Sequence, residues 1–187
     1  MVKIIEFNTE RLRLRQWRTE DRNPFAALNA DTKVMEYFPK PLSRVESDEL
    51  LNRCRALIAE RGWGFWAVET KSENEFIGFV GLHIPTYDLP FSPCVEVGWR
   101  LGAKHWGKGF ATEAARGALR IGFESLEFLE IVSFTAVENN RSRAVMERLH
   151  MRYTGETFEH PNVPVNSPLR KHCLYRLSRE QWIADAA

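Results

Sequence analysis

The sequence predicts an α/β protein built on one mixed, mostly antiparallel sheet. Segments with the alternating apolar pattern of strands recur through the first 101 residues, and two helical segments interrupt them. After residue 94, strands and helices alternate, which favours a parallel β-α-β step within the same sheet. A chain of 187 residues, 44% of them hydrophobic, has the size of one compact domain, so we expect a single domain over residues 1–187.

In the first half of the chain, apolar patterning and turn residues define the expected elements. Leu alternates with Arg in the first strand, and aromatic and branched residues fill the next two strands around a polar turn. Ser43 and Glu46 have the spacing of a capping box, which indicates a helix start at Ser43. The expected elements are a strand over 12–17, helices over 21–37 and 43–61, and a hairpin of strands over 64–69 and 76–84.

In the second half, strands are expected to alternate with helices. One helix carries Ala111, Ala114, Ala115 and Ala118 at helical spacing, and these small side chains would let it lie close to the sheet. The expected elements are strands over 94–101, 131–137, 151–158 and 172–177, helices over 110–123 and 141–150, and a helical tail.

Charge and cysteine content exclude several classes of protein. Lys and Arg total 26 against 25 for Asp and Glu, so nothing in the net charge of +1 favours nucleic acid or a membrane surface as a partner. The clustered Arg11, Arg13 and Arg15 are expected on one solvated strand face. Three isolated cysteines form no CxxC pair, which argues against a disulfide framework or a metal site, and no secretory signal is recognised. We therefore expect a cytoplasmic protein without metal.

The stretch from residue 101 to 118 carries the strongest chemical signal. A strand ends there, a loop with Gly107 and Gly109 follows, and a helix begins. Glycines let backbone N–H groups approach a ligand closely, and the first turn of a helix offers unpaired N–H groups at its positive end. The arrangement predicts a binding site for phosphate or pyrophosphate. A tight strand–helix connection that binds nothing remains the alternative.

A nucleotide-binding P-loop is the competing explanation for this stretch. The spacing from Gly102 to Gly107 and Lys108 matches a Walker A motif, but Gly109 stands where Ser or Thr should bind Mg²⁺. The preceding strand also lies in mid-chain, with little room after it for a doubly wound domain. Both observations disfavour a nucleotide hydrolase.

Several motifs in order resemble the GNAT superfamily of N-acetyltransferases, in its ribosomal-protein-alanine acetyltransferase-like branch. Residues 106–114 (WGKGFATEA) resemble that superfamily's coenzyme A pyrophosphate loop. The other matching segments are 9–17 (TERLRLRQW), 76–82 (FIGFVGL), 95–101 (VEVGWRL) and 138–151 (ENNRSRAVMERLHM). His150 replaces the glycine that usually ends the last of these helices, which puts the local geometry of that helix end in question.

The resemblance implies a GNAT fold and acetyl-CoA as co-substrate. Such a fold has a mixed sheet of about seven strands whose central parallel strands splay apart, with helices on both faces. The pantetheine arm of acetyl-CoA lies between the splayed strands and the pyrophosphate lies on the loop. The resemblance places Trp99, Arg100, Leu101 and Asn139 on the arm, and Trp106, Gly107, Lys108, Gly109, Phe110, Ala111 and Thr112 on the pyrophosphate.

The resemblance also implies acetyl transfer to a primary amine of a small molecule or a protein N-terminus, by direct attack in a ternary complex. Glu96 is the first candidate for the base that takes the amine proton, and His83 is the second. Ser142 matches the residue that returns a proton to the coenzyme thiolate. Each has a structural alternative: Glu96 as a solvated strand residue, His83 as a hydrogen bonder, and Ser142 as a helix-start residue.

Other roles stay open at this point. A binding module that keeps the coenzyme site without chemistry is the main alternative to an enzyme. Cys94 has no activating partner in sequence, so a covalent route is disfavoured. Trp63, Phe65 and Trp66 are core or acceptor-pocket residues, and the Pro-rich segment 158–170 is a lid, a homodimer contact or a plain surface loop.

Overall fold

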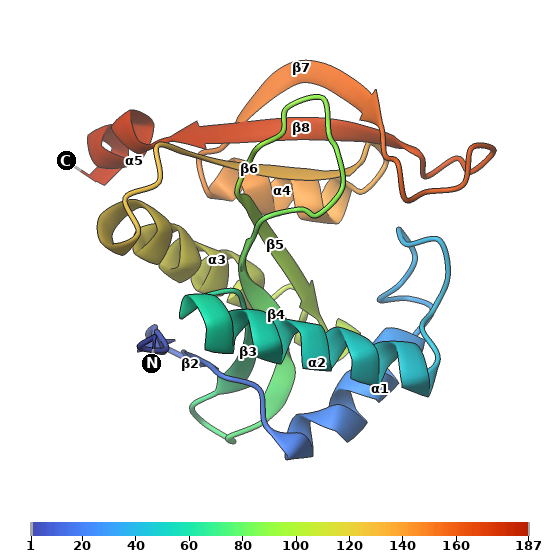
Figure 1. The fold of residues 1–187 in the computed structure, drawn as a ribbon, viewed down its shortest axis with the longest axis vertical. Coiled ribbons are helices and arrows are strands. Elements are labelled where there is room, and N and C mark those ends of the chain that lie inside the picture. The colour runs from blue at the N-terminus through green and yellow to red at the C-terminus, as the bar shows by residue number, and fades with distance from the viewer. Residues whose placement is uncertain (1, 187) are drawn as a thin grey trace.

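The computed structural model describes residues 2–186, which form an eight-stranded mixed sheet with helices packed on it (Figure 1). The strand order is β1-β2-β3-β4-β5-β6-β8-β7. Among these strands β5 and β6 pair in parallel and the other neighbours pair antiparallel. The predicted mixed, mostly antiparallel sheet is confirmed, and the strand beyond the expected seven is the two-residue β1.

The N-terminal half supplies four strands and two helices. Ser43 caps α2 as predicted: its hydroxyl accepts from the Glu46 backbone N–H at 3.2 Å, and the Glu46 carboxylate accepts from the Ser43 N–H at 2.7 Å. Gly62, with φ of 86°, ends this helix in the left-handed conformation. The elements are β1 (Phe7–Asn8), β2 (Leu12–Arg15), a 3₁₀ turn (Thr19–Asp21), α1 (Arg22–Ala30), α2 (Arg44–Arg61), β3 (Phe65–Thr70) and β4 (Phe76–His83).

Helix α1 is shorter than the predicted helix over 21–37, because the chain leaves the helical conformation at Asp31. Asp31 is extended (φ −72°, ψ 114°), and its carboxylate accepts from the backbone N–H of Lys33 at 2.8 Å. A short acidic side chain that satisfies a nearby backbone N–H competes with helix continuation. Residues 31–39 therefore form turns, with Val34 and Met35 buried, and we call this stretch the turn segment.

The C-terminal half alternates strands and helices as predicted. His150 adopts the left-handed conformation with φ of 60°, so the chain keeps the usual helix-end geometry without glycine. The helix predicted over 110–123 ends at Arg120 and continues as a π turn. The elements are β5 (Glu96–Leu101), a 3₁₀ turn (Ala103–His105), α3 (Phe110–Arg120), a π turn (Ile121–Ser125), β6 (Glu130–Ala136), α4 (Asn140–Arg148), β7 (Arg152–Glu159), β8 (Lys171–Ser178) and α5 (Arg179–Ala186).

Helices cover both faces of the central strands (Figure 1). On one face, the Phe25 ring of α1 lies 6.0 Å from the Phe79 ring of β4. On the other face, Gly122 after α3 packs beside Leu82 of β4 and Ile131 of β6. None of the described helices has the length and apolar character that crossing a membrane requires.

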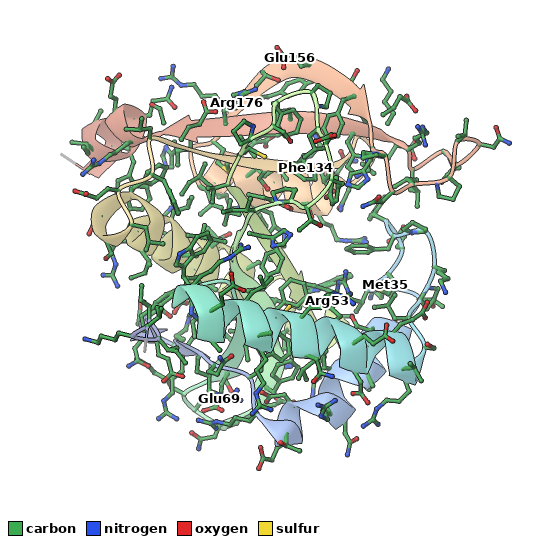
Figure 2. All side chains as sticks on the ribbon, viewed as in Figure 1. Met35, Arg53, Glu69, Phe134, Glu156 and Arg176 are labelled. Atoms are coloured by element: carbon green, nitrogen blue, oxygen red, sulfur yellow. The ribbon has the colours of Figure 1, made fainter. Side chains whose placement is uncertain are left out.

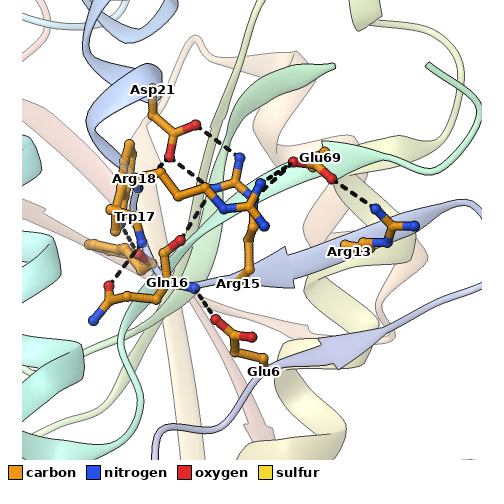
Figure 3. A network of polar contacts seen from close by, with 9 residues as sticks. Glu6, Arg13, Arg15, Gln16, Trp17, Arg18, Asp21 and Glu69 are labelled. Atoms are coloured by element: carbon orange, nitrogen blue, oxygen red, sulfur yellow. Dashed lines mark hydrogen bonds and ion pairs between the residues drawn. The ribbon is translucent and has the colours of Figure 1, made fainter. Parts of the chain in front are cut away.

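A buried polar network at the end of β2 corrects one expectation (Figure 3). Arg15 was predicted on a solvated face with Arg13, but it is only 5% exposed. Its guanidinium donates to both carboxylate oxygens of Asp21, at 2.8 and 2.9 Å, and to Glu69 at 2.9 Å. Arg13 also reaches Glu69, at 3.1 Å, yet its side chain stays 47% exposed. Two carboxylates from the neighbouring turn and strand therefore compensate the burial of Arg15.

Candidate active site

A cavity of about 1010 Å³ opens where β5 and β6 separate. Its walls come from these two strands, the loop before α3, the first turns of α3 and α4, the turn segment, and the loops that carry Tyr87 and His160. In Figure 2, Phe134 of β6, which lines the cavity, lies just below β8, and Met35 lies lower, within the turn segment. Segments from most of the chain length therefore meet at this one cavity.

The two strands share only a short parallel contact. Glu96 and Val132 form the one registered pair, and the Val132 N–H donates to the Val95 carbonyl at 2.8 Å. The Ser133 hydroxyl donates to the Val97 carbonyl at 2.9 Å. Beyond this point, no described residue of β6 pairs with β5, so the expected splay is confirmed. An extended ligand arm that enters there can pair with free backbone groups like an added strand.

The loop before α3 is shaped for an anion. Gly107 and Gly109 have φ of 73° and 79°, in the left-handed region that glycine tolerates best. A Cβ atom at Gly107 would meet no atom within 4 Å, so the space above it is open. Gly109 is the N-cap of α3 and its carbonyl accepts from the Glu113 N–H. The first N–H groups of α3 are thus left for a ligand, which fits a pyrophosphate.

Arg11 is exposed as expected, but it lies just before β2 and braces this loop from outside. Its guanidinium donates to the Lys108 carbonyl at 2.9 Å and to the Glu113 carboxylate at 2.6 Å. The Thr9 hydroxyl donates to the other oxygen of the same carboxylate at 2.6 Å. The loop carbonyl is therefore held outward. No sequence pattern relates residues 9–11 to residue 113, and sequence reasoning missed this brace.

The predicted coenzyme residues are brought together with one exception. Lys108 is exposed and does not line the cavity, although its backbone belongs to the loop. The Trp106 indole N–H donates to the Leu101 carbonyl at 2.8 Å, which ties the loop to the end of β5. The predicted residues that line the cavity are Trp99, Arg100, Leu101, Trp106, Gly107, Gly109, Phe110, Ala111, Thr112 and Asn139.

Asn139 and Ser142 sit together at the start of α4, on the cavity wall. The Asn139 side chain caps the helix by accepting from the Ser142 backbone N–H at 3.2 Å. Its amide nitrogen donates to the Thr135 hydroxyl at 2.9 Å and to the Ser142 hydroxyl at 3.1 Å. Asn139 is therefore the capping residue, and the Ser142 hydroxyl does not cap the helix.

Glu96 lies on the cavity wall with an altered acidity. Burial raises the pKa of its carboxyl group to about 8. One carboxylate oxygen lies 3.3 Å from the position that a Cβ of Gly98 would take, so the side chain runs along β5 toward Gly98. A carboxyl group of this pKa exchanges protons near neutral pH, as a general base requires.

The other predicted residues do not line the cavity. His83 is paired with Glu96 across β4 and β5, but its ring stacks on Phe65 at 5.2 Å and does not line the cavity. Trp63 and Trp66 belong to the core, with 9% and 0% of their surfaces exposed. Cys94 precedes β5, and burial raises the pKa of its thiol to about 11, so it is not a thiolate at neutral pH.

Several cavity residues were missed because their segments carry no motif. The Tyr87 hydroxyl and His160 Nε2 are 3.2 Å apart, which joins the loop after β4 to the loop after β7. Burial lowers the pKa of His160 to about 4, so its ring is neutral. The segment 158–170 thus contributes to the cavity wall. Further lining residues from segments without a motif include Tyr37, Phe38, Phe134, Val163 and His172.

Within the described residues, no group of three or more His, Cys, Asp or Glu side chains is arranged to hold a metal ion.

Comparisons with known proteins match this chain to acetyltransferases. A family model described as an acetyltransferase (GNAT) domain matches residues 11–152. An FsC-acetyl coenzyme A-N(2)-transacetylase from Aspergillus fumigatus is 30% identical over 185 residues, covering 94% of this chain and 77% of the fungal protein. A GNAT acetyltransferase structure from Bacillus anthracis has a TM-score of 0.79 at 25% identity, covering 94% of this chain and 99% of the other. A spermidine N-acetyltransferase from Vibrio cholerae, solved with CoA and spermine, has a TM-score of 0.72 at 23% identity, covering 92% of this chain and 98% of the other.

Proposed function

The chain belongs to the GNAT acetyltransferase family, and from this premise we propose that it binds acetyl-CoA and acetylates a primary amine. Transfer would take place by direct attack of the amine on the acetyl group while both substrates are bound. The acceptor is a small molecule or a protein N-terminus. The Aspergillus fumigatus relative is named as an N-transacetylase that uses an acetyl-coenzyme A, which supports this assignment.

One observation carries the proposal: the open anion loop, the separated strands and Glu96 all line one cavity. The loop fits the pyrophosphate, and the unpaired edge of β5 from Gly98 onward fits the pantetheine arm. An arm that follows this edge would bring its thioester toward Gly98, where the Glu96 carboxylate also lies. The reacting atoms would then meet beside a group able to take a proton.

The chain's own residues supply the acid–base chemistry. An alkyl amine has a pKa of about 10.4 and must lose a proton before it attacks. Glu96, with a pKa of about 8, would accept that proton directly or through water. A backbone N–H near Gly98 or Trp99 would donate to the oxygen on which negative charge develops. Ser142 would return a proton to the departing thiolate, a modest contribution because a thiol has a pKa of about 8.5.

Calorimetric titration with acetyl-CoA tests the coenzyme site. We expect binding that falls at least tenfold in Gly109→Ala, because a side chain in the left-handed region costs about 1–2 kcal/mol and displaces the loop. Gly155→Ala is the matched control: Gly155 has the same φ of 79° and open space around it, but it lies on β7 away from the cavity. Equal affinities of the two variants for acetyl-CoA would show that the loop does not contribute to the binding site. Binding of ATP with Mg²⁺ in place of acetyl-CoA would overturn the proposal.

Turnover separates an enzyme from a silent binding module. The wild-type protein is mixed with acetyl-CoA and a panel of primary amines, and release of free CoA thiol is followed with a thiol reagent. We expect thiol release that depends on both substrates. Binding of acetyl-CoA without turnover on any amine would identify a coenzyme-binding module.

A further inference from the structure

Arg100 presents a fixed guanidinium at the cavity wall without a carboxylate partner. Its carbon lies 4.1 Å from the Phe38 ring centroid and 5.4 Å from that of Phe79, so aromatic rings hold it in place. Nη1 donates to the Asn29 side-chain oxygen at 2.7 Å, whereas Nε is buried with no hydrogen-bond partner. No carboxylate of the described residues lies within ion-pair distance of Arg100. Burial lowers its pKa only to about 10, so it stays charged at neutral pH.

One edge of the guanidinium has no hydrogen-bond partner among the described residues. Nη1 is engaged by Asn29, and the opposite edge consists of the Nε–H and one Nη2–H. These two donors are parallel and match the two oxygens of a carboxylate. A buried donor without a partner is costly, and an incoming acceptor would remove that cost. The free edge therefore favours an anionic group with two acceptor atoms.

The charged residues that line the cavity also favour an anionic ligand. Glu96 is the one acidic residue among the described residues that line it, and its raised pKa keeps it largely neutral at pH 7. Arg100, Arg141 and Arg148 line the same cavity. Arg141 and Arg148 belong to α4, which faces the pyrophosphate loop, so the phosphates of the coenzyme can account for them. Arg100 extends from the same face of β5 as Glu96 and is left for the acceptor.

Glu96 and Arg100 border the acceptor side of the cavity at two separate points. Glu96, Gly98 and Arg100 alternate onto one face of β5, and the Glu96 carboxylate lies beside Gly98. The Phe65 ring packs against Gly98 on the same face, 3.2 Å from the position that a Cβ would take.

We propose that the acceptor is a small amine that also carries a carboxylate, with Arg100 binding the carboxylate and the amine facing Glu96. This inference rests on the proposed acetyl transfer and narrows its acceptor. A polyamine would place positive charges against an arginine, and a protein N-terminus would place a neutral peptide group there. A polyamine has no acceptor oxygen, and a peptide group offers one neutral carbonyl oxygen where the free guanidinium edge has two donors.

Matched substrates test the proposal. Acetylation of ω-amino acids, such as β-alanine and γ-aminobutyrate, is compared with acetylation of their carboxamides, each kcat/KM being corrected for the fraction of neutral amine. We expect the wild-type protein to favour the acids by at least tenfold. Arg100→Gln should bring the ratio of acid to amide close to one, and Arg100→Lys should give an intermediate ratio. Arg148→Gln, which removes a charge from another wall of the cavity, should leave the ratio unchanged.

The ratio is measured within each protein, so a general loss of activity does not imitate the effect. A wild-type ratio near one, or a high ratio that persists in Arg100→Gln, would overturn the proposal while leaving acetyl transfer intact. Should Arg100→Gln fail to fold, the wild-type ratio and the Arg100→Lys ratio still decide. Should no amine react, calorimetry with N-acetyl-β-alanine and its carboxamide on the wild-type protein decides: preference for the acid supports the carboxylate site, and no preference refutes it.

Discussion

The guanidinium of Arg141 lies over the indole ring of Trp106, with its carbon 4.6 Å from the ring centroid. The same guanidinium lies 5.3 Å from the Tyr37 ring and forms an ion pair with Glu36. The start of α4, the loop before α3 and the turn segment are thus joined at the cavity by one side chain. An exposed ion pair alone contributes little, so the stacking on Trp106 is the stronger link.

Replacing Arg141 should therefore loosen the turn segment and weaken coenzyme binding together. We expect Arg141→Ala to raise the Kd for acetyl-CoA about tenfold and to speed amide hydrogen exchange across residues 31–39. Glu36→Gln removes the ion pair but keeps the stacking, and it should leave both quantities nearly unchanged. Equal effects of the two variants would assign the link to the ion pair.

The raised pKa of Glu96 predicts the pH dependence of the rate. Only the ionised carboxylate accepts a proton, so kcat/KM should rise with pH and bend near pH 8. An acceptor with an amine pKa above 9.5 separates this step from ionisation of the substrate. In Glu96→Gln we expect a rate about 10²-fold lower and no bend near pH 8. A bend that persists in the variant would assign the base to another group.

The same shift predicts an effect on stability with a defined sign. The folded-state pKa of Glu96, about 8, lies above the value of 4.5 for the free side chain, so the folded state favours the protonated form. Its contribution to stability is present below pH 4.5 and is lost as the pH rises through 8. Urea unfolding should show the wild-type protein losing roughly 2–3 kcal/mol relative to Glu96→Gln between pH 6 and pH 9. Parallel pH profiles of the two proteins would contradict the burial of this carboxyl group.

The network around Arg15 predicts a large difference between two arginines of one strand. Arg15→Met would leave Asp21 without its two charged hydrogen bonds in a buried position, at a cost of about 3 kcal/mol in unfolding free energy. Arg13→Met removes an exposed partner of Glu69 and should cost less than about 1 kcal/mol. Urea titration at pH 7 measures both. Similar costs would mean that Asp21 finds compensation elsewhere.

Sequence reasoning reached most strands and helices, and the glycine loop before α3, because these depend on local patterns. Alternation, the Ser43 capping box and the glycines at 107 and 109 act within a few residues of each other, and the structure has the corresponding elements. Strand alternation wrongly predicted that Arg15 is solvated, because its burial depends on Glu69, which is 54 residues away along the chain. For the same reason, the sequence did not predict the contact of Arg11 with Glu113, 102 residues away, or that of Tyr87 with His160, 73 residues away. Long-range polar contacts carry no periodic signal, so they become visible only in three dimensions.

Two neighbouring residues at the start of α4 should separate stability from chemistry. Asn139 caps the helix, whereas the Ser142 hydroxyl only accepts from the Asn139 amide at 3.1 Å. Asn139→Ala should therefore cost about 1 kcal/mol of unfolding free energy. Ser142→Ala should change stability by less than about 0.5 kcal/mol, the usual range for a substitution that disturbs no cap or core.

If Ser142 returns a proton to the thiolate, Ser142→Ala should lower kcat by roughly tenfold with the Kd for acetyl-CoA unchanged. The effect should shrink with an acetyl thioester whose leaving thiol has a lower pKa, because such a thiolate needs no proton to depart. Single-turnover kinetics with the two thioesters measures this difference. An equal loss with both would show that Ser142 positions the coenzyme and does not donate the proton.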